Sequence, residues 1–157
     1  MKQNPRKSAL RILNRVDAGA FAEPLLNACL SEGGWVNIHD RRLLTQLVYG
    51  VLRMRGRLDR LLSQVYRGRF EKMETGLKNI LRAGLYQILF IDRIPHHAAV
   101  NESVRLAKKN FPGREALVNA VLRNAIRNLD EPGYPELETE PAEHIAVVYS
   151  HPLWLVR

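Results

Sequence analysis

The side chains best suited to bind a ligand are basic residues close to the start of the chain. Lys7, Arg11 and Arg15 recur every four residues, so on a helix they lie on one face. Lys2 and Arg6 lead into that face. Guanidinium and ammonium groups bind phosphate oxygens, although a solvated helix face has the same pattern. We interpret these five residues as a candidate phosphate-binding surface.

A second basic cluster lies in the middle of the chain. Arg53, Arg57 and Arg60 are spaced to share one outward helix face. Further arginines extend the cluster, namely Arg55, Arg67 and Arg69. This cluster is the alternative phosphate-binding surface.

The charge of the chain is unevenly distributed. Residues 1–129 hold 23 Lys and Arg against 10 acids, a net charge of +13, whereas residues 130–157 hold 1 against 6, a net charge of −5. Arginine outnumbers lysine 18 to 6, and its planar fork matches phosphate geometry. The first part therefore favours a polyanionic partner such as a nucleic acid.

Catalytic and metal-binding patterns are missing. There is no glycine-rich phosphate loop, and His96-His97 followed by Asn101-Glu102 is not the zinc-binding HExxH arrangement. The single cysteine, Cys29, excludes an internal disulfide and is interpreted as a small buried apolar residue. No apolar run is long enough for a membrane span or a secretory signal. We expect no catalytic residue and no metal in this segment, and a cytoplasmic location.

The elements that would position the basic residues are all helical, because apolar residues recur with helical spacing and no strand alternation occurs. Asn4 is the expected cap of a first helix, with Pro5 at its first position, and Asp40 the expected cap of a third. Gly50 and Gly56 predict a kink or break near residues 54–57. The expected helices span residues 5–20, 22–32, 40–66 and 71–92, followed by a helical hairpin over 95–127 that turns at 111–113. The fold class is an all-α, compact bundle of about six or seven helices, with the very apolar 71–92 helix at its centre.

Two asparagines stand out in the hairpin. Asn101 and Asn119 lie in or beside the apolar runs of its two helices. They could hydrogen-bond backbone groups at neighbouring helix ends and fix the register of the bundle, or they could read nucleic-acid bases. We expect the structural role for both.

The sequence changes character after the hairpin. Residues 130–141 combine prolines, acids and a glycine, which predicts an extended acidic linker. Residues 142–157 begin a further helical pattern that stops after the start of a new helix. We therefore expect three parts, residues 1–129, 130–141 and 142–157, and interpret the chain as a fragment of a longer protein.

Several segments together resemble the NusB-like fold, an all-helical RNA-binding domain. The resemblance covers residues 5–128 and is carried by the segments Arg41-Arg42-Leu43-Leu44, Leu58-Asp59-Arg60-Leu61-Leu62, Leu81-Arg82-Ala83-Gly84-Leu85-Tyr86-Gln87-Ile88, Ala99-Val100-Asn101-Glu102-Ser103-Val104 and Leu117-Val118-Asn119-Ala120-Val121-Leu122-Arg123. It implies that the N-terminal segment contacts RNA, here through Lys2, Arg6 and Lys7, extended by Arg11 and Arg15.

The tail over 149–156 resembles the junction in the RsmB (Sun/Fmu) family of 16S rRNA cytosine-C5 methyltransferases. That resemblance implies a non-catalytic, substrate-positioning domain with 16S rRNA and a C-terminal methyltransferase domain as partners, neither DNA nor a membrane, and a dimer as one option. S-adenosyl-L-methionine and two catalytic cysteines would belong to the methyltransferase domain. A stand-alone NusB-type antitermination or rRNA-processing factor is the alternative, and a helical protein-docking module without RNA is a third.

Overall fold

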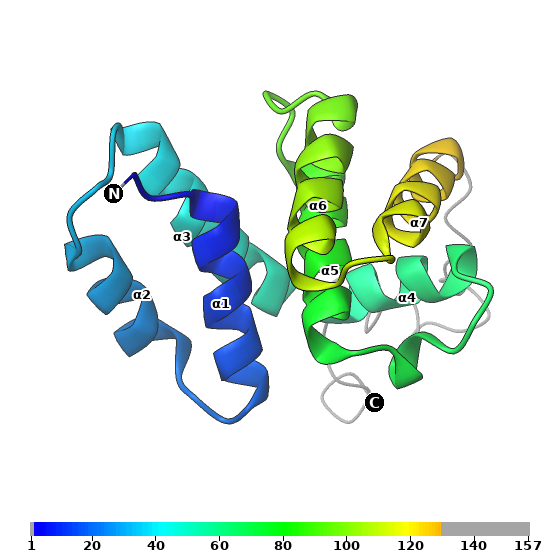
Figure 1. Ribbon diagram of the computed structural model, residues 1–157, viewed down its shortest axis with the longest axis horizontal. Coiled ribbons are helices and arrows are strands. Elements are labelled where there is room, and N and C mark those ends of the chain that lie inside the picture. Colours follow the sequence, from blue (N-terminus) through cyan, green and yellow to red (C-terminus); the bar gives the residue numbers. More distant parts are fainter. Residues whose placement is uncertain (1, 130–157) are drawn as a thin grey trace, which may run out of the picture.

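A computed structural model describes residues 2–129, and all regular structure in that range is helical (Figure 1). The elements are α1 (Pro5–Asp17), α2 (Ala22–Ser31), α3 (Ile38–Arg53), α4 (Arg55–Val65), the short 3₁₀ helix η1 (Phe70–Lys72), α5 (Thr75–Phe90), α6 (His96–Asn110) and α7 (Glu115–Arg127). The prediction of an all-α bundle is confirmed, with seven α-helices in the described range. The predicted linker over 130–141 and the segment 142–157 lie outside the described residues.

The start of α1 is fixed by the predicted cap. The Asn4 side chain accepts hydrogen bonds from the backbone N–H groups of Arg6, at 3.0 Å, and Lys7, at 3.1 Å. These bonds satisfy two donors that have no partner inside the helix, and Pro5 occupies the first helical position. The helix ends at Asp17, three residues before the predicted end, and Gly19 turns the chain with a φ of 109°.

The predicted kink between the third and fourth helices is confirmed, because Met54 separates α3 from α4. The predicted cap is wrong: α3 begins at Ile38, and its cap is Asn37, whose side chain accepts from the backbone N–H of Asp40 at 2.9 Å. Gly50 does not mark the break. A Cβ at Gly50 would collide with the ring of Tyr86 on α5, so this glycine allows α3 and α5 to pack closely.

The helix predicted over 71–92 is shorter than expected. Phe70 and Met73 are buried and lie three residues apart, a spacing that puts both on one side of a 3₁₀ turn. This turn, η1, replaces the first residues of the predicted helix, and α5 starts only at Thr75. Every α5 residue from Asn79 to Ile88 is buried.

The central position predicted for this helix is confirmed. Helix α5 packs against α1, α3, α4, α6 and α7. Figure 1 shows α1, α2 and α3 grouped on one side of it and α4 and α7 on the other, with α6 overlapping it in this view. At Gly84 an added Cβ would lie 2.5 Å from Ser103 Oγ on α6 and 2.9 Å from a methyl carbon of Leu122 on α7. The missing side chain at Gly84 therefore lets the α6–α7 hairpin sit tightly on α5.

Candidate nucleic-acid interface

Helix α1 separates its apolar and basic residues onto opposite faces. Ala9, Ile12 and Leu13 are buried, whereas Lys7, Arg11 and Arg15 are exposed. Lys2, which precedes the helix, is also exposed. The structure therefore keeps these four predicted residues at the surface, and we refer to Lys7, Arg11 and Arg15 as the α1 stripe.

A further cation, Lys109 of α6, lies beside this stripe, and the sequence did not indicate it. The pKa of Lys7 is lowered, first by its contact with the Lys109 side chain and then by the positive charge of Lys109. The positive charge of Arg11 lowers it further. Lys109 comes from the last turn of α6, where a lysine is ordinarily explained by its favourable interaction with the helix dipole. Only the packing of the bundle brings it to α1. The result is a group of cations from two helices whose mutual repulsion an anion would relieve.

Arg6 differs from the other predicted residues because it is partly buried. Its Nε donates a hydrogen bond of 2.8 Å to Oε1 of Gln87, a buried residue of α5. Burial lowers the pKa of Arg6, and the charges of Glu102 and Asp40 oppose that change. Arg6 therefore ties the start of α1 to the central helix, and only part of its guanidinium can meet a ligand.

The second predicted cluster is divided by other contacts. Arg53 and Arg60 are exposed, but Arg57 lies over the ring of Phe90 at 5.2 Å. Arg55 turns inward, with Nη1 at 2.6 Å from a carboxylate oxygen of Asp17. The break at Met54 also places Arg53 on a different helix from the rest. The structure thus divides this cluster between two helices and engages Arg55 and Arg57 in contacts with other side chains.

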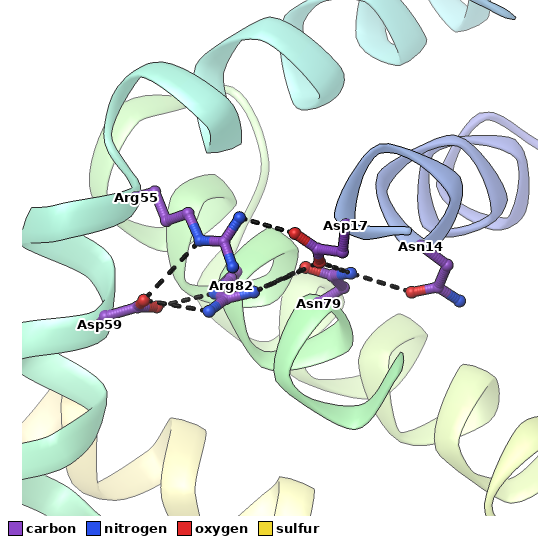
Figure 2. A network of polar contacts seen from close by, with 6 residues as sticks. All are labelled: Asn14, Asp17, Arg55, Asp59, Asn79 and Arg82. Carbon is purple, nitrogen blue, oxygen red and sulfur yellow. Dashed lines mark hydrogen bonds and ion pairs between the residues drawn. The ribbon is translucent and has the colours of Figure 1, made fainter. Parts of the chain in front are cut away.

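Six polar residues form a network between α1, α4 and α5 that was not predicted (Figure 2). Arg82, with a side chain only 3% exposed, donates to both carboxylate oxygens of Asp59 at 2.7 and 3.0 Å. It also donates to Oδ1 of Asn79 at 3.0 Å. The Asn79 amide in turn donates to side-chain oxygens on α1 at 2.9 Å each. The complete network, called the polar junction below, is Asn14, Asp17, Arg55, Asp59, Asn79 and Arg82.

The protonation of Asp17 reflects this setting. Burial, the largest influence, acts to raise the pKa of Asp17, but hydrogen bonds from Asn79 and Arg55 and the charges of Arg55 and Arg82 outweigh it. The net effect is a lowered pKa, so the carboxylate stays ionised between its cationic neighbours. The polar junction therefore satisfies its own charges and leaves little for a ligand.

The asparagines of the hairpin are placed differently from Asn79. Asn119 accepts a hydrogen bond of 3.0 Å from Nε of Arg123, one turn further along the same helix. Asn101 is exposed on α6. The bond of Asn119 lies within one helix, so the asparagine that demonstrably joins helices is Asn79. A signal for it was present, since Asn79 and Arg82 lie three residues apart in a mostly apolar helix.

Residues 2–129 also bear on two other kinds of site. No group of three or more His, Cys, Asp or Glu side chains in this range is arranged to hold a metal ion. No helix in the same range has the length and apolar character needed to cross a bilayer. The exposed cations of α1 and α6 are thus the strongest candidate interface in this range.

Comparison with known proteins agrees with this architecture. The sequence profile of the NusB family matches residues 3–127. The probable ribosomal RNA small subunit methyltransferase B of Bacillus subtilis (strain 168) is 32% identical over 157 residues, which covers 99% of this chain and 34% of that protein. The ribosomal RNA small subunit methyltransferase B of Pseudomonas syringae pv. tomato is 38% identical, with 97% of this chain and 32% of that protein covered. The probable enzyme of the same name in Synechocystis is 40% identical, with 94% and 32% covered.

The chain spans about a third of the length of these relatives. The family profile, in contrast, covers nearly the whole described range, from the residue before the α1 cap to the end of α7. By sequence and by helical architecture, this chain belongs to the NusB family.

Proposed function

We propose that this segment is the RNA-binding, substrate-positioning domain of an S-adenosyl-L-methionine-dependent rRNA cytosine-C5 methyltransferase, and is itself non-catalytic. The observation that carries the proposal is the α1 stripe, extended by Lys109, in a domain whose relatives are named ribosomal RNA small subunit methyltransferases. A surface of exposed cations suits phosphates, and a helical domain without a catalytic cluster suits positioning. We place the whole protein in the cytoplasm, with 16S rRNA as its substrate.

The division of labour follows from the chemistry. Phosphate contacts fix the register and orientation of a nucleic acid but do not specify its sequence. Methylation at C5 of a cytosine requires the base to leave its stack and enter a catalytic pocket. In this proposal the α1 stripe holds the backbone of a folded rRNA segment while a following catalytic domain receives the cytosine. The domain thus lengthens the time that the correct rRNA region spends at the catalytic centre.

The cofactor does not fit the described part of the chain. S-adenosyl-L-methionine sites of Rossmann-like domains use a glycine-rich turn between a strand and a helix, and residues 2–129 contain helices without a strand. No step of the methyl transfer is therefore assigned to these residues. The cofactor and the catalytic cysteines would belong to a methyltransferase domain that begins around Ala142.

The first test removes the α1 stripe. We expect the triple variant Lys7→Gln, Arg11→Gln, Arg15→Gln to bind single-stranded rRNA fragments more weakly. If about six cations of the wild type contact phosphates, log K should fall with log salt with a slope near −4, and loss of three should bring it to about −2. Fluorescence anisotropy over a salt series measures both quantities.

The matched control removes equal charge elsewhere. Arg53→Gln, Arg60→Gln, Arg67→Gln also deletes three exposed arginines, and it leaves Arg57 on its aromatic ring. We expect its salt slope to stay close to that of the wild type. A larger loss in this variant than in the stripe variant would move the RNA surface to the α3–α4 side, and a flat salt dependence of the wild type would overturn RNA binding by the basic face.

The second test concerns the gene. The proposal expects the reading frame to continue past Arg157 into a Rossmann-like domain with a glycine-rich loop and two catalytic cysteines. A stop codon shortly after Arg157 would overturn the methyltransferase assignment and support the stand-alone antitermination or processing factor instead.

A further inference from the structure

An open hollow of about 350 Å³ lies at the N-terminal end of the α1 stripe. Three segments that are far apart in the sequence form its walls: the residues that lead into α1, the first turn of α3 and the middle of α6. Figure 1 shows the N-terminus next to the beginning of α3, with α6 on the other side of α1. The lining residues are Lys2, Gln3, Asn4, Pro5, Arg6, Asp40 and Glu102.

The hollow combines acceptors with donors. Asp40 and Glu102 contribute carboxylates, whose negative charges act on Arg6. The hydrogen bond that Asp40 makes to the cap residue Asn37 uses its backbone N–H. Glu102 uses one oxygen to pair with Arg105 at 3.2 Å. Arg6 spends its Nε on Gln87, which is one of the five N–H donors of a guanidinium. Lys2 adds an exposed ammonium group.

This mixture of carboxylates and cations does not suit a phosphate group, but it suits the hydrogen-bonding edge of a nucleic-acid base. Two carboxylates repel an anion, so the hollow cannot simply extend the α1 stripe. Single-stranded RNA is recognised through hydrogen bonds to the Watson–Crick edges of unstacked bases. Guanine is the base that places two adjacent N–H donors, which suit a carboxylate, beside a carbonyl oxygen, which suits a cation. Adenine, uracil and cytosine lack that donor pair.

We propose that this hollow binds the Watson–Crick edge of an unpaired guanine, with the Asp40 carboxylate accepting from N1–H and the 2-amino group and Arg6 or Lys2 donating to O6. The inference rests on the proposed RNA-binding function and deepens it. Lys2 lines the hollow, and Lys7 of the stripe directly follows Arg6 in the sequence. An RNA backbone held along α1 can therefore lead one base into the hollow.

A purely structural role for Asp40 predicts something different. An acid in the first turn of a helix is favoured by the helix dipole, and that role involves no preference among RNA sequences. The guanine proposal requires Asp40 to affect two binding properties in opposite directions. Loss of its charge should weaken guanine recognition and at the same time strengthen binding of RNA that lacks guanine, because one negative charge near the phosphates has gone.

The experiment uses the 157-residue chain and short single-stranded oligouridines that carry one central guanine, inosine, adenine or cytosine. We expect the guanine probe to bind about tenfold more tightly than plain oligouridine, with inosine, which lacks the 2-amino group, in between. Asp40→Asn should abolish the preference for guanine and raise the affinity for plain oligouridine. Glu102→Gln, on the opposite wall, should reduce the preference by a smaller factor.

The matched control is Glu23→Gln. It removes one exposed negative charge at the start of α2, near the other end of α1, and should leave the guanine preference unchanged. Salt-dependent binding without a guanine preference, or a preference that persists in Asp40→Asn, would overturn this inference alone. Failure of every probe to bind would overturn the proposed RNA-binding function as well. Should Asp40→Asn melt early, the inosine probe on the wild type decides, because equal affinity for guanine and inosine is incompatible with a carboxylate that accepts from the 2-amino group.

Discussion

Helix α1 carries two kinds of charged surface that behave in opposite ways. Near its C-terminal end, Asn14 and Asp17 point toward α5 and join the polar junction, in which a buried arginine meets two carboxylates and an amide. On its outer face, Lys7, Arg11 and Arg15 are exposed, and the neighbour that reaches Lys7 from α6 is another cation. The paired charges of the polar junction hold helices together, whereas the like charges of the α1 stripe repel each other and can bind an anionic partner.

The junction also illustrates why a buried ion pair is a poor measure of net stability. Transfer of Arg82 and its acidic partners from water costs several kcal/mol for each ion, roughly offset by their mutual attraction. What the junction adds is geometry, since Arg82 contacts Asp59 on α4 while Asn79 contacts Asn14 on α1. One helix is thereby fixed against two others. Removal of a single member should therefore lower the free energy of unfolding strongly, even though the complete network contributes little net stability.

The largest expected effect comes from Arg82→Met, which keeps the side-chain length but removes the donors. The acids and Asn79 lose their common partner, so we expect unfolding free energy to fall by about 3 kcal/mol. Urea unfolding followed by circular dichroism measures the change.

Arg105→Met is the matched control for this variant. Arg105 also pairs with a carboxylate, Glu102, but its side chain is 79% exposed, and exposed pairs contribute at most about 1 kcal/mol. A loss in Arg105→Met equal to that in Arg82→Met would show that burial does not distinguish the two pairs. Adding Asp59→Leu to Arg82→Met should recover part of the lost stability, because the partly buried carboxylate that has lost both hydrogen bonds from Arg82 is then removed.

The helices could be predicted from the sequence because their determinants are local. The apolar spacing, the Asn4 cap and the break near Met54 each depend on a few neighbouring residues. Errors occurred where two local signals compete. Asn37 and Asp40 are both good capping residues, and no local rule shows that Asn37 caps the helix while Asp40 sits in its first turn.

The polar junction could not be predicted because its partners are distant in the chain. Arg82 is 23 residues from Asp59, and Asn79 is 65 residues from Asn14. The periodicity of α5 correctly indicated a central helix, but it could not show that the centre contains a paired arginine. The same limit applies to the surface: the α1 stripe was visible as a spacing of four, whereas Lys109 joined it only through the packing of the bundle.

An intermediate effect is expected from Asp17, and it depends on pH. The pKa of Asp17 is lower in the folded protein than its ordinary value of 3.8, so the ionised carboxylate stabilises the fold at neutral pH. That contribution should be fully present above about pH 4 and should be lost as pH falls through the folded pKa. Asp17→Asn should cost roughly 1–2 kcal/mol at pH 7 and progressively less at lower pH.

Urea midpoints of the wild type and Asp17→Asn between neutral and strongly acidic pH test this expectation. The two curves should converge in acid. Glu71→Gln is a suitable control, because Glu71 is paired with Arg69 at 3.3 Å but is 68% exposed. A difference between wild type and Asp17→Asn that stays constant down to low pH would mean that the charge of Asp17 does not contribute.

The smallest expected effect on stability, and one of opposite sign, belongs to the α1 stripe. Arg11 lies one turn from both Lys7 and Arg15, and like charges at this spacing repel each other. Arg11→Gln should therefore raise the unfolding free energy by roughly half a kcal/mol at low salt, with the gain shrinking as salt screens the charges. The same substitution should weaken RNA binding. Thermal melts at low and high salt measure the change in stability, and the anisotropy assay measures the change in RNA binding. A clear loss of stability in Arg11→Gln would mean that the α1 stripe stabilises the fold, as the polar junction does.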